Sequence, residues 1–282
     1  MNKIIDGQAL ANEIIERIKR EKRRLKLGVV LVGDNPVSRL YLSQKEKICR
    51  RVGFKFCLFQ YPQKIREDIL LTKIKTVARQ CSGLIIQLPL PSHLDTTRIL
   101  NAVPVKKDID VLTSVAQGKF YSGDFSILPP VVSAIKYLLE KEKLLLKGKN
   151  IVVIGSGRLV GKPLTVWLMA QKATVLVINR LTVNLPSLIR KADILISGVG
   201  KANLVKGDMI KRGAVVIDVG SSVERGSLTG DLEIKSVIKK ASRMAVVPGG
   251  VGPITTACLL ENLIKLYQLK QMTNNKRQAT KN

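Results

Sequence analysis

Helix patterns and short apolar segments alternate along this chain, and this alternation limits its fold more than any other feature. In the first third each helix pattern precedes a strand pattern, in the order helix 9–24, strand 27–32, helix 38–52, strand 54–59, helix 66–80 and strand 83–87. A second series follows the loop-rich stretch 104–130, in the order helix 131–143, strand 150–154, helix 161–171, strand 174–178, helix 185–191 and strands 194–197 and 214–219. Such alternation predicts an α/β fold with mainly parallel sheets.

The second series begins with a glycine-rich loop where a dinucleotide-binding fold needs one. Strand 150–154 runs directly into this loop, and a helix pattern follows it. Glycines there let the main chain approach a pyrophosphate, and the helix N-terminus offers free N–H groups. The last glycine lies one residue beyond the usual spacing. The loop residues predicted to bind the cofactor are Gly155, Ser156, Gly157, Arg158 and Gly161.

The end of the next strand indicates which dinucleotide this loop binds. An NAD-preferring site usually has an acidic residue there, which accepts hydrogen bonds from the ribose hydroxyls. This chain has Asn179 and Arg180 instead, and a guanidinium can pair with a 2′-phosphate. We therefore predict NADP as the cofactor, with NAD as the alternative.

The chain is strongly basic, but other features argue against several classes of protein. Its net charge of +27 attracts polyanions, yet aromatic residues are only 4% and do not alternate with basic ones as they do on nucleic-acid stacking surfaces. We expect a cytoplasmic protein with no membrane contact, because no run of eighteen apolar residues and no signal-peptide pattern occurs. The scattered cysteines predict buried, reduced thiols: Cys49, Cys57, Cys81 and Cys258.

Four motifs occur in an order that identifies a family. They are V-G-D-N-P-V-S at 32–38 followed by Tyr41 and Lys45, G-L-I-I-Q-L-P-L-P at 83–91, K-D-I-D at 107–110 and P-G-G-V-G-P-I-T at 248–255. In these motifs the chain resembles the bifunctional methylenetetrahydrofolate dehydrogenase/methenyltetrahydrofolate cyclohydrolase family over nearly its whole length. The resemblance implies oxidation of 5,10-methylenetetrahydrofolate with NADP⁺, then hydrolysis to 10-formyltetrahydrofolate, in one-carbon metabolism.

Four side chains carry the folate chemistry that the resemblance implies. Lys45 would handle protons during hydration, Gln87 would hold it, Tyr41 would contact the folate, and Asp110 would accept hydrogen bonds from the pterin. The residues agree, since Tyr41 and Lys45 are four apart on a helix pattern and burial lowers the pKa of a lysine. By resemblance, further contacts to folate come from Leu88, Pro248, Gly249 and Gly250, and a further cofactor contact comes from Ser221. No metal site is predicted, and the lone His93 is interpreted as structural.

The domain ranges follow from the patterns and the resemblance together. We predict a folate-binding catalytic domain at 1–140, a Rossmann-like NAD(P)-binding domain at 141–252, a C-terminal helix at 253–270 that packs on the first domain, and a basic, disordered tail at 271–282. The resemblance also implies a homodimer. The basic charge suits the glutamate tail of a folate, including polyglutamylated forms.

The chain departs from the family pattern at positions that bear on activity. Val111 replaces the glycine that follows K-D-x-D, and a β-branched residue where φ is positive predicts a changed loop. Pro130 and Val131 replace a segment with a threonine, Ser156 replaces an arginine, and Ser221 replaces an apolar residue. Two alternatives therefore stay open: a single retained activity, or a degenerate folate-enzyme fold that binds nucleic acid. A hydroxy-acid dehydrogenase is disfavoured because its histidine base and ribose-binding acid are missing.

Overall fold

Two parallel sheets organise the chain, and each is the centre of its own unit. The computed structural model describes residues 3–224 and 227–279. The unit around the smaller sheet, the three-strand unit, contains Glu13–Pro130 and the chain from Thr256 onward. The five-strand unit contains the chain up to Asn12 and Val131–Thr255. This architecture confirms the predicted two-domain α/β class.

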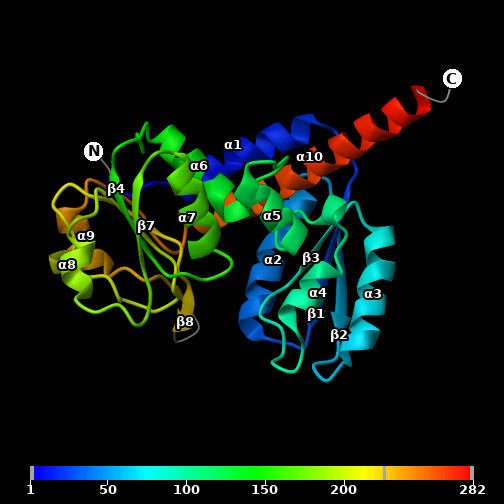
Figure 1. The fold of residues 1–282 in the computed structure, drawn as a ribbon, viewed down its shortest axis with the longest axis horizontal. Helices are drawn as coiled ribbons and strands as arrows, with labels where there is room; N and C mark the ends of the chain where they lie inside the picture. The colour runs from blue at the N-terminus through cyan, green and yellow to red at the C-terminus, as the bar shows by residue number, and fades with distance from the viewer. Residues whose placement is uncertain (1–2, 225–226, 280–282) are drawn as a thin grey trace. The chain divides into compact units, whose positions relative to one another are not determined.

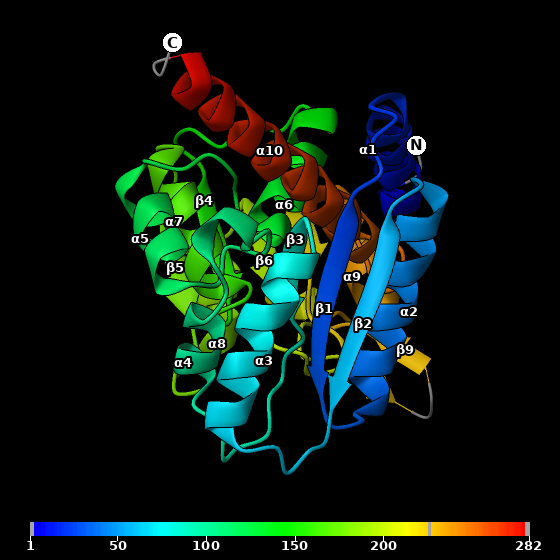
Figure 2. The ribbon, with the colours of Figure 1, turned by 90° about the vertical axis from the view of Figure 1, so that its right-hand side faces the viewer.

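The sheet of the three-strand unit has the order β2-β1-β3, with all strands parallel. The strands are β1 (Lys26–Val32), β2 (Lys55–Tyr61) and β3 (Gly83–Ile86). The helices are α2 (Pro36–Arg51), α3 (Glu67–Gln80), α4 (Thr96–Asn101), α5 (Ser114–Ser122) and the 3-10 turn η1 (Val105–Lys107). Helices α2 and α3 lie on opposite sides of the sheet (Figure 1, Figure 2). Because the strands are parallel, their carboxyl ends meet at one edge, where ligand-binding residues of α/β proteins lie.

Helix α3 anchors this sheet through an apolar stripe. Its buried residues Leu70, Ile74 and Val77 recur at helical spacing and belong to one core cluster with Val30 of β1 and Ile86 of β3. Each such side chain contributes about 1.5–3 kcal/mol when it is fully buried. The core therefore fixes the end of β3, which leads directly to Gln87.

Helix α2 begins at a well-defined cap, and this cap sets the register of the helix. The Asn35 side chain accepts hydrogen bonds from the main-chain N–H groups of Val37 and Ser38, and Pro36 occupies the first turn. Both features favour a helix start. Tyr41 and Lys45 consequently lie one turn apart on this helix.

Helix α10 (Val251–Ala279) closes the three-strand unit through one buried amide. The Asn262 side chain is 1% exposed, and its Nδ2 donates to the carbonyls of Ile109 at 3.0 Å and Leu128 at 2.8 Å. Ile109 stands inside the K-D-I-D motif. The helix therefore holds that motif in place.

Replacing Asn262 by leucine should destabilise the protein by about 3 kcal/mol, because the buried carbonyl of Ile109 and the partly buried carbonyl of Leu128 lose their donor. Urea unfolding of the purified variant measures the change. The exposed Gln271 lies on the same helix, and Gln271→Leu should change stability by less than about 0.5 kcal/mol. Equal effects of the two substitutions would contradict the anchoring role of Asn262.

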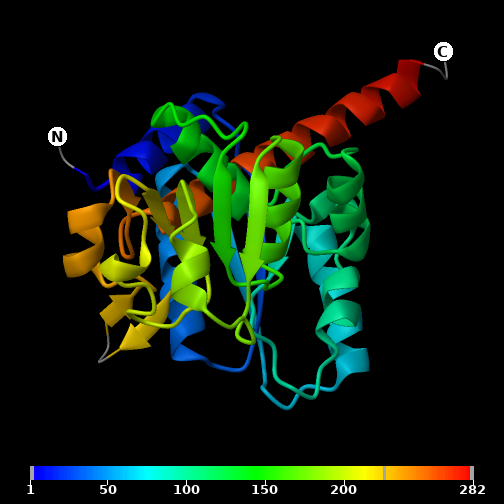
Figure 3. The ribbon, with the colours of Figure 1, turned by 60° about the vertical axis from the view of Figure 1, so that its left-hand side comes forward.

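The sheet of the five-strand unit has the order β10-β7-β6-β4-β5, and its strands are parallel (Figure 3). The strands are β4 (Asn150–Ile154), β5 (Thr174–Ile178), β6 (Ile194–Ser197), β7 (Val215–Asp218) and β10 (Arg243–Ala245), and β8 (Ser222–Glu224) pairs antiparallel with β9 (Ser227–Thr229). The helices are α6 (Pro130–Lys141), α7 (Gly161–Ala170), α8 (Leu185–Ile189), α9 (Ile234–Lys240) and the 3-10 turn η2 (Gly207–Met209). The strand order reverses direction at β4, which makes its carboxyl end a switch point where such sheets bind ligands.

The chain divides between the units differently from the predicted ranges. Residues 3–12 and 131–140 belong to the five-strand unit, not to the first domain. For residues 3–12 the reason is long-range pairing, since Ile5 N–H donates to the Met244 carbonyl at 2.8 Å and Met244 N–H donates to the Lys3 carbonyl at 2.8 Å. These partners are separated by about the whole chain, so local patterns carry no sign of them.

Several element bounds also differ from the expected ones. Helix α1 (Gly7–Arg20) ends before 24, the stretch 104–130 contains η1 and α5, and α10 runs from 251 to 279. The predicted disordered tail is therefore wrong for 271–279, while 280–282 lie outside the described residues. No glycine or proline follows Pro253 to end that helix. Among the helices described, none combines the length and apolar character needed to cross a membrane.

Candidate active site

The end of β3 and the middle of α2 bring two predicted residues together. Lys45 Nζ donates a hydrogen bond of 2.8 Å to Gln87 Oε1, and Gln87 Nε2 donates to the Leu88 carbonyl at 2.8 Å. The Gln87 N–H also donates to the carbonyl of Val30 in β1 at 2.8 Å. The amide orientation of Gln87 is thus set from both sides, and its oxygen faces the lysine amine.

The amine of Lys45 and the carboxyl of Asp110 interact electrostatically. Burial lowers the pKa of Lys45, and the negative charge of Asp110 partly opposes this. Burial raises the pKa of Asp110 to about 6; Lys45 opposes this rise, and Asp108 adds to it. The two shifts bring the proton affinities of the groups closer together, so that a proton moves between water and this site at modest cost.

Tyr41 is half-buried and lies one turn before Lys45 on α2. The two side chains therefore belong to successive turns of α2, as predicted. The Lys45 amine is hydrogen-bonded to Gln87 and not to Tyr41. The contact of Tyr41 with folate remains a prediction.

The K-D-I-D motif is fixed by its own polar groups. Lys107 Nζ donates to the carbonyls of Ala78 and, at 2.6 Å, Cys81 at the end of α3. The buried Asp108 carboxylate accepts from the main-chain N–H groups of Leu112 at 3.0 Å and Thr113 at 2.8 Å. The turn that carries Asp110 is therefore held at both ends.

Val111 is the residue at which the sequence-based expectation needs correction. A changed loop was expected because a β-branched residue disfavours positive φ, yet Val111 itself adopts φ = 57°. The side chain is 3% exposed, and the hydrogen bonds to Asp108 hold the residues that follow it. Burial and these hydrogen bonds offset the backbone strain, which is of order 1–3 kcal/mol.

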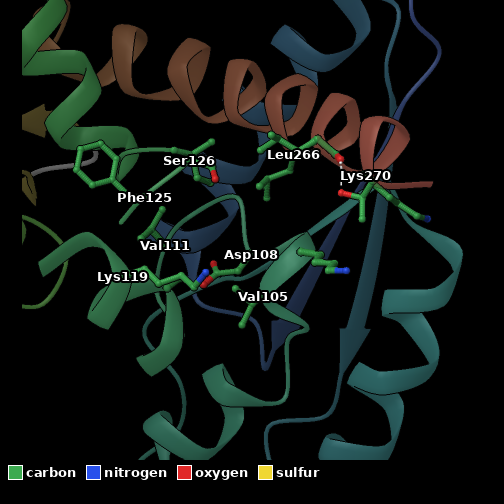
Figure 4. A pocket seen from close by; sticks show the side chains of 13 residues that line it. Val105, Asp108, Val111, Lys119, Phe125, Ser126, Leu266 and Lys270 are labelled. Atoms are coloured by element: carbon green, nitrogen blue, oxygen red, sulfur yellow. Dashed lines mark hydrogen bonds between the residues drawn. The ribbon is translucent and has the colours of Figure 1, made fainter. Parts of the chain in front are cut away.

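A cavity of about 360 Å³ lies beside this turn, within the three-strand unit. Val111 and Asp108 line it from the turn, Lys119 from α5, and Leu266 and Lys270 from α10 (Figure 4). Neither Lys45 nor Gln87 lines it. The cavity is thus separate from the hydrogen-bonded lysine and glutamine.

The glycine-rich loop of the five-strand unit has the geometry of a dinucleotide cradle. Gly155 follows β4 with φ = 107°, and its N–H donates to the Ile178 carbonyl at 2.7 Å. Gly161 begins α7, and a Cβ there would overlap the carbonyl of Gly155. Ser156, Gly157 and Arg158 are exposed between them. The loop fits a pyrophosphate, because a Cβ placed on Gly157 would meet no atom within 4 Å and the N-terminus of α7 lies at the end of the loop.

Arg180 lies at the same edge of the sheet as this loop. Ile154 and Ile178 are partners in the β4–β5 register, and Gly155 and Arg180 follow them closely in sequence. The turn at 179–182 is closed by its own hydrogen bonds, from Asn179 N–H to Thr182 Oγ1 and from Leu181 N–H to Asn179 Oδ1. Arg180 is exposed in that turn. Its guanidinium is therefore accessible to the 2′-phosphate of a bound NADP.

Two family models match this chain in succession. The model for the catalytic domain of tetrahydrofolate dehydrogenase/cyclohydrolase matches residues 5–110, and the model for the NAD(P)-binding domain of the same family matches residues 129–271. The chain belongs to this family. The sequence-based identification is confirmed.

Relatives of this tetrahydrofolate dehydrogenase/cyclohydrolase family member cover nearly its whole length. The bifunctional protein FolD of Hydrogenobaculum sp. is 41% identical over 273 residues, which are 94% of this chain and 98% of that protein. The FolD crystal structure from Campylobacter jejuni is 36% identical with a TM-score of 0.88, covering 94% of this chain and 98% of that one. The Trypanosoma brucei structure, complexed with NADP cofactor and inhibitor, is 30% identical with a TM-score of 0.90, covering 95% and 97%.

The other predicted site residues of this family member lie in the five-strand unit. Pro248, Gly249 and Gly250 connect β10 to α10, and Ser221 follows β7. His93 is exposed and its Nε2 lies 3.1 Å from the carbonyl oxygen of Ile65. The four cysteines are free thiols.

Two buried acids of the family member were missed by the sequence-based prediction. Asp218 and Asp231 are 1% and 0% exposed, close to the carboxyl ends of β6 and β7. Neither acid stands in a motif that predicted a site residue. Only their contacts, which join segments far apart in the chain, distinguish them from ordinary surface acids.

Proposed function

We propose that this chain oxidises 5,10-methylenetetrahydrofolate to 5,10-methenyltetrahydrofolate with NADP⁺ and then hydrolyses the product to 10-formyltetrahydrofolate. The observation that carries the proposal is the hydrogen bond of 2.8 Å between Lys45 and Gln87, beside Asp110, in a chain that matches both domain models of the family. The residues of the three-strand unit proposed to act on folate are Tyr41, Lys45, Gln87, Leu88 and Asp110. Pro248, Gly249 and Gly250 of the five-strand unit remain predicted folate contacts.

Lys45 performs the proton transfers of the hydrolysis. Water adds to the methenyl carbon and loses a proton, which the neutral amine of Lys45 accepts. The bond from that carbon to N5 then breaks, N5 gains a proton, and the hydroxyl becomes the formyl oxygen, so that one water is consumed and one proton is released. Burial favours the neutral amine, and the Gln87 oxygen holds it in position.

The oxidation depends on positioning more than on acids or bases. Hydride leaves the methylene carbon with its electron pair, and the neighbouring folate nitrogen stabilises the cation that remains. NADP⁺, when bound, supplies the hydride acceptor. Gly155, Gly157 and Gly161 fit its pyrophosphate, as the overlap caused by a Cβ at Gly161 indicates, and Ser156, Arg158 and Ser221 complete the predicted contacts. This step requires no titrating side chain.

Reversing the charge at Arg180 should reverse the cofactor preference. Arg180→Asp is expected to raise the KM for NADP⁺ by about 30-fold, because a carboxylate repels the 2′-phosphate that the guanidinium attracts, and to leave the KM for NAD⁺ within about threefold. Initial rates with each cofactor measure the change. Lys239→Asp, an equal charge change at an exposed position on α9, serves as the control. A parallel rise in both KM values would contradict the role of Arg180.

The purified chain is tested by mixing it with 5,10-methylenetetrahydrofolate and either cofactor while the reduced nicotinamide and the methenyl absorbance are followed together. Reduction of NADP⁺ without build-up of methenyl product is the expected result. Build-up of methenyl product would mean that only the dehydrogenase is retained. Folate binding without reduction of either cofactor would overturn the proposed activity and favour a binding protein.

The proposal extends to the setting of the enzyme. We place it in the cytoplasm as a homodimer, in line with the family resemblance, and its substrates include polyglutamylated folates, which a net charge of +27 attracts. Sedimentation of the purified chain tests the dimer. A lower KM for the pentaglutamate than for the monoglutamate substrate tests the attraction, and it should weaken as salt is added.

A further inference from the structure

The proposed mechanism assigns no role to the two buried carboxylates of the five-strand unit. Asp218 ends β7, and Asp231 follows β9. Both lie almost entirely out of contact with water, at 1% and 0% exposure. Because burying an ionisable group is costly unless its oxygens are hydrogen-bonded, the partners of these oxygens indicate what the acids hold.

Asp231 holds the segment 197–201, which follows β6. Its Oδ2 accepts from Ser197 Oγ at 2.7 Å and from Val199 N–H at 2.9 Å. Its Oδ1 accepts from Lys201 N–H at 2.8 Å. Three hydrogen bonds from one short segment converge on one carboxylate that is distant in sequence. The path of this segment therefore depends on Asp231.

The same segment forms a wall of the dinucleotide loop. A Cβ placed on Gly155 would lie 2.9 Å from both the Gly198 carbonyl oxygen and Val199 Cγ1, and a Cβ on Gly198 would lie 2.7 Å from Cγ1 of Val160. Gly155 and Val160 bound the predicted cofactor loop on either side. A shift of the segment 197–201 would consequently push on the loop itself, since the packing leaves no free space between them.

Asp218 locks Asp231 in place from the neighbouring strand. It accepts from Leu232 N–H and Gly220 N–H, each at 3.1 Å. A Cβ on Gly220 would overlap the Asp231 carboxylate, and one on Gly230 would overlap the Asp218 carboxylate. Burial raises the pKa of Asp218 to about 7; hydrogen bonds from the main-chain N–H groups of Asp231, Leu232 and Gly220 oppose this rise, and the negative charge of Asp231 adds to it. Each carboxylate therefore packs directly against a glycine, Asp231 against Gly220 and Asp218 against Gly230.

We propose that Asp231 is a positioning residue for the nicotinamide dinucleotide: it holds the segment 197–201 so that the Gly155–Gly161 loop keeps the shape that accepts the pyrophosphate. This inference rests on the proposed function, and it adds a residue that has no direct contact with the predicted cofactor loop. It acts through the main-chain N–H groups of Val199 and Lys201.

Asp231→Asn tests the proposal with little change of shape. An asparagine has one acceptor oxygen where the aspartate has two, so its amide group faces at least one main-chain N–H. The dissociation constant for NADPH, measured by its fluorescence on binding, should rise about tenfold. The KM for NADP⁺ should rise similarly. The cyclohydrolase rate with methenyltetrahydrofolate, a reaction that consumes no cofactor, should stay within about twofold.

The matched control lies at the opposite end of β6, the strand that ends at Ser197. Asp193 directly precedes β6 and accepts from Asn150 N–H at 3.0 Å and Lys211 Nζ at 2.6 Å. Asp193→Asn should lower the melting temperature and leave the NADPH dissociation constant unchanged. An equal weakening of NADPH binding by both variants would overturn the proposal, as would a variant of Asp231 that loses stability and both activities in parallel at unchanged affinity.

A second variant decides the matter if Asp231→Asn does not fold. Ser197→Ala removes one of the three donors to Asp231, so NADPH should bind about two- to fivefold more weakly, with the cyclohydrolase rate retained. Unchanged affinity would overturn the proposal. Because NADPH binding is measured directly, a chain that binds NADPH without any turnover contradicts the proposed activity and still tests Asp231. A wild-type chain that does not bind NADPH overturns both.

Discussion

Replacing Lys45 by methionine should lower the cyclohydrolase kcat by about 10³-fold while NADPH affinity stays within about twofold. The lysine amine is the group placed to take the proton from the attacking water, and Gln87 Oε1 holds it at 2.8 Å. Methionine has a similar length and no proton to exchange. Because the predicted NADPH contacts are residues of the five-strand unit, we expect a change in the three-strand unit to leave them intact.

The Lys45 prediction is checked by two assays on one preparation. Loss of methenyltetrahydrofolate absorbance measures the hydrolysis, and NADPH fluorescence measures cofactor binding. Lys47, which is exposed on the same helix, supplies the matched control, since Lys47→Met changes the charge equally without touching Gln87. A cyclohydrolase that survives in Lys45→Met would show that another group moves the proton, and lost NADPH binding would show that the assignment of Lys45 is wrong.

The opposite separation should follow from a single methyl group in the dinucleotide loop. Gly161→Ala is expected to lower the dehydrogenase kcat/KM for NADP⁺ by at least about 100-fold and to leave the cyclohydrolase within about threefold. The added Cβ would overlap the carbonyl of Gly155, and the atoms in conflict belong to the main chain, which cannot rotate away as a flexible side chain does. The loop must therefore move, and its N–H groups lose their aim at the pyrophosphate.

A glycine in open surroundings provides the comparison. Nothing lies within 4 Å of a Cβ added to Gly118 in α5, so Gly118→Ala should keep both activities and gain slightly in helix stability. NADPH titration and the two rate assays measure all three proteins. Full dehydrogenase activity in Gly161→Ala would mean that the loop tolerates the shift and that cofactor binding does not depend on its present shape.

Local patterns predicted the features that depend on neighbours in sequence. The alternation of helix patterns with short apolar runs predicted the parallel strands. The order of strand, glycine-rich segment and helix predicted the position of the dinucleotide loop. Resemblance to a family located Lys45, Gln87 and Asp110, and the structure brings the first two into a hydrogen bond. The prediction of the α/β fold is confirmed, because burial patterns and turn residues are set within about ten residues of each position.

Val111 shows where a local rule failed. A β-branched residue disfavours positive φ, so a changed loop was the reasonable expectation. Burial of its side chain and the hydrogen bonds that Asp108 accepts from Leu112 and Thr113 outweigh that preference. Conformational preference is worth a few kcal/mol at most, and tertiary contacts of similar size can reverse it.

The sequence by itself determined the fold class, the family, the dinucleotide loop and the main candidates for folate chemistry. Only the tertiary structure decided which unit holds the N-terminal segment, that α10 continues through residue 279, and that Asp231 holds the segment 197–201. Strand and helix patterns arise from contacts between near neighbours, so they can be recognised in the sequence. The contacts of Asp231 with Ser197 and of Lys3 with Met244 join residues 34 and about 240 positions apart, and only the folded chain brings such partners together.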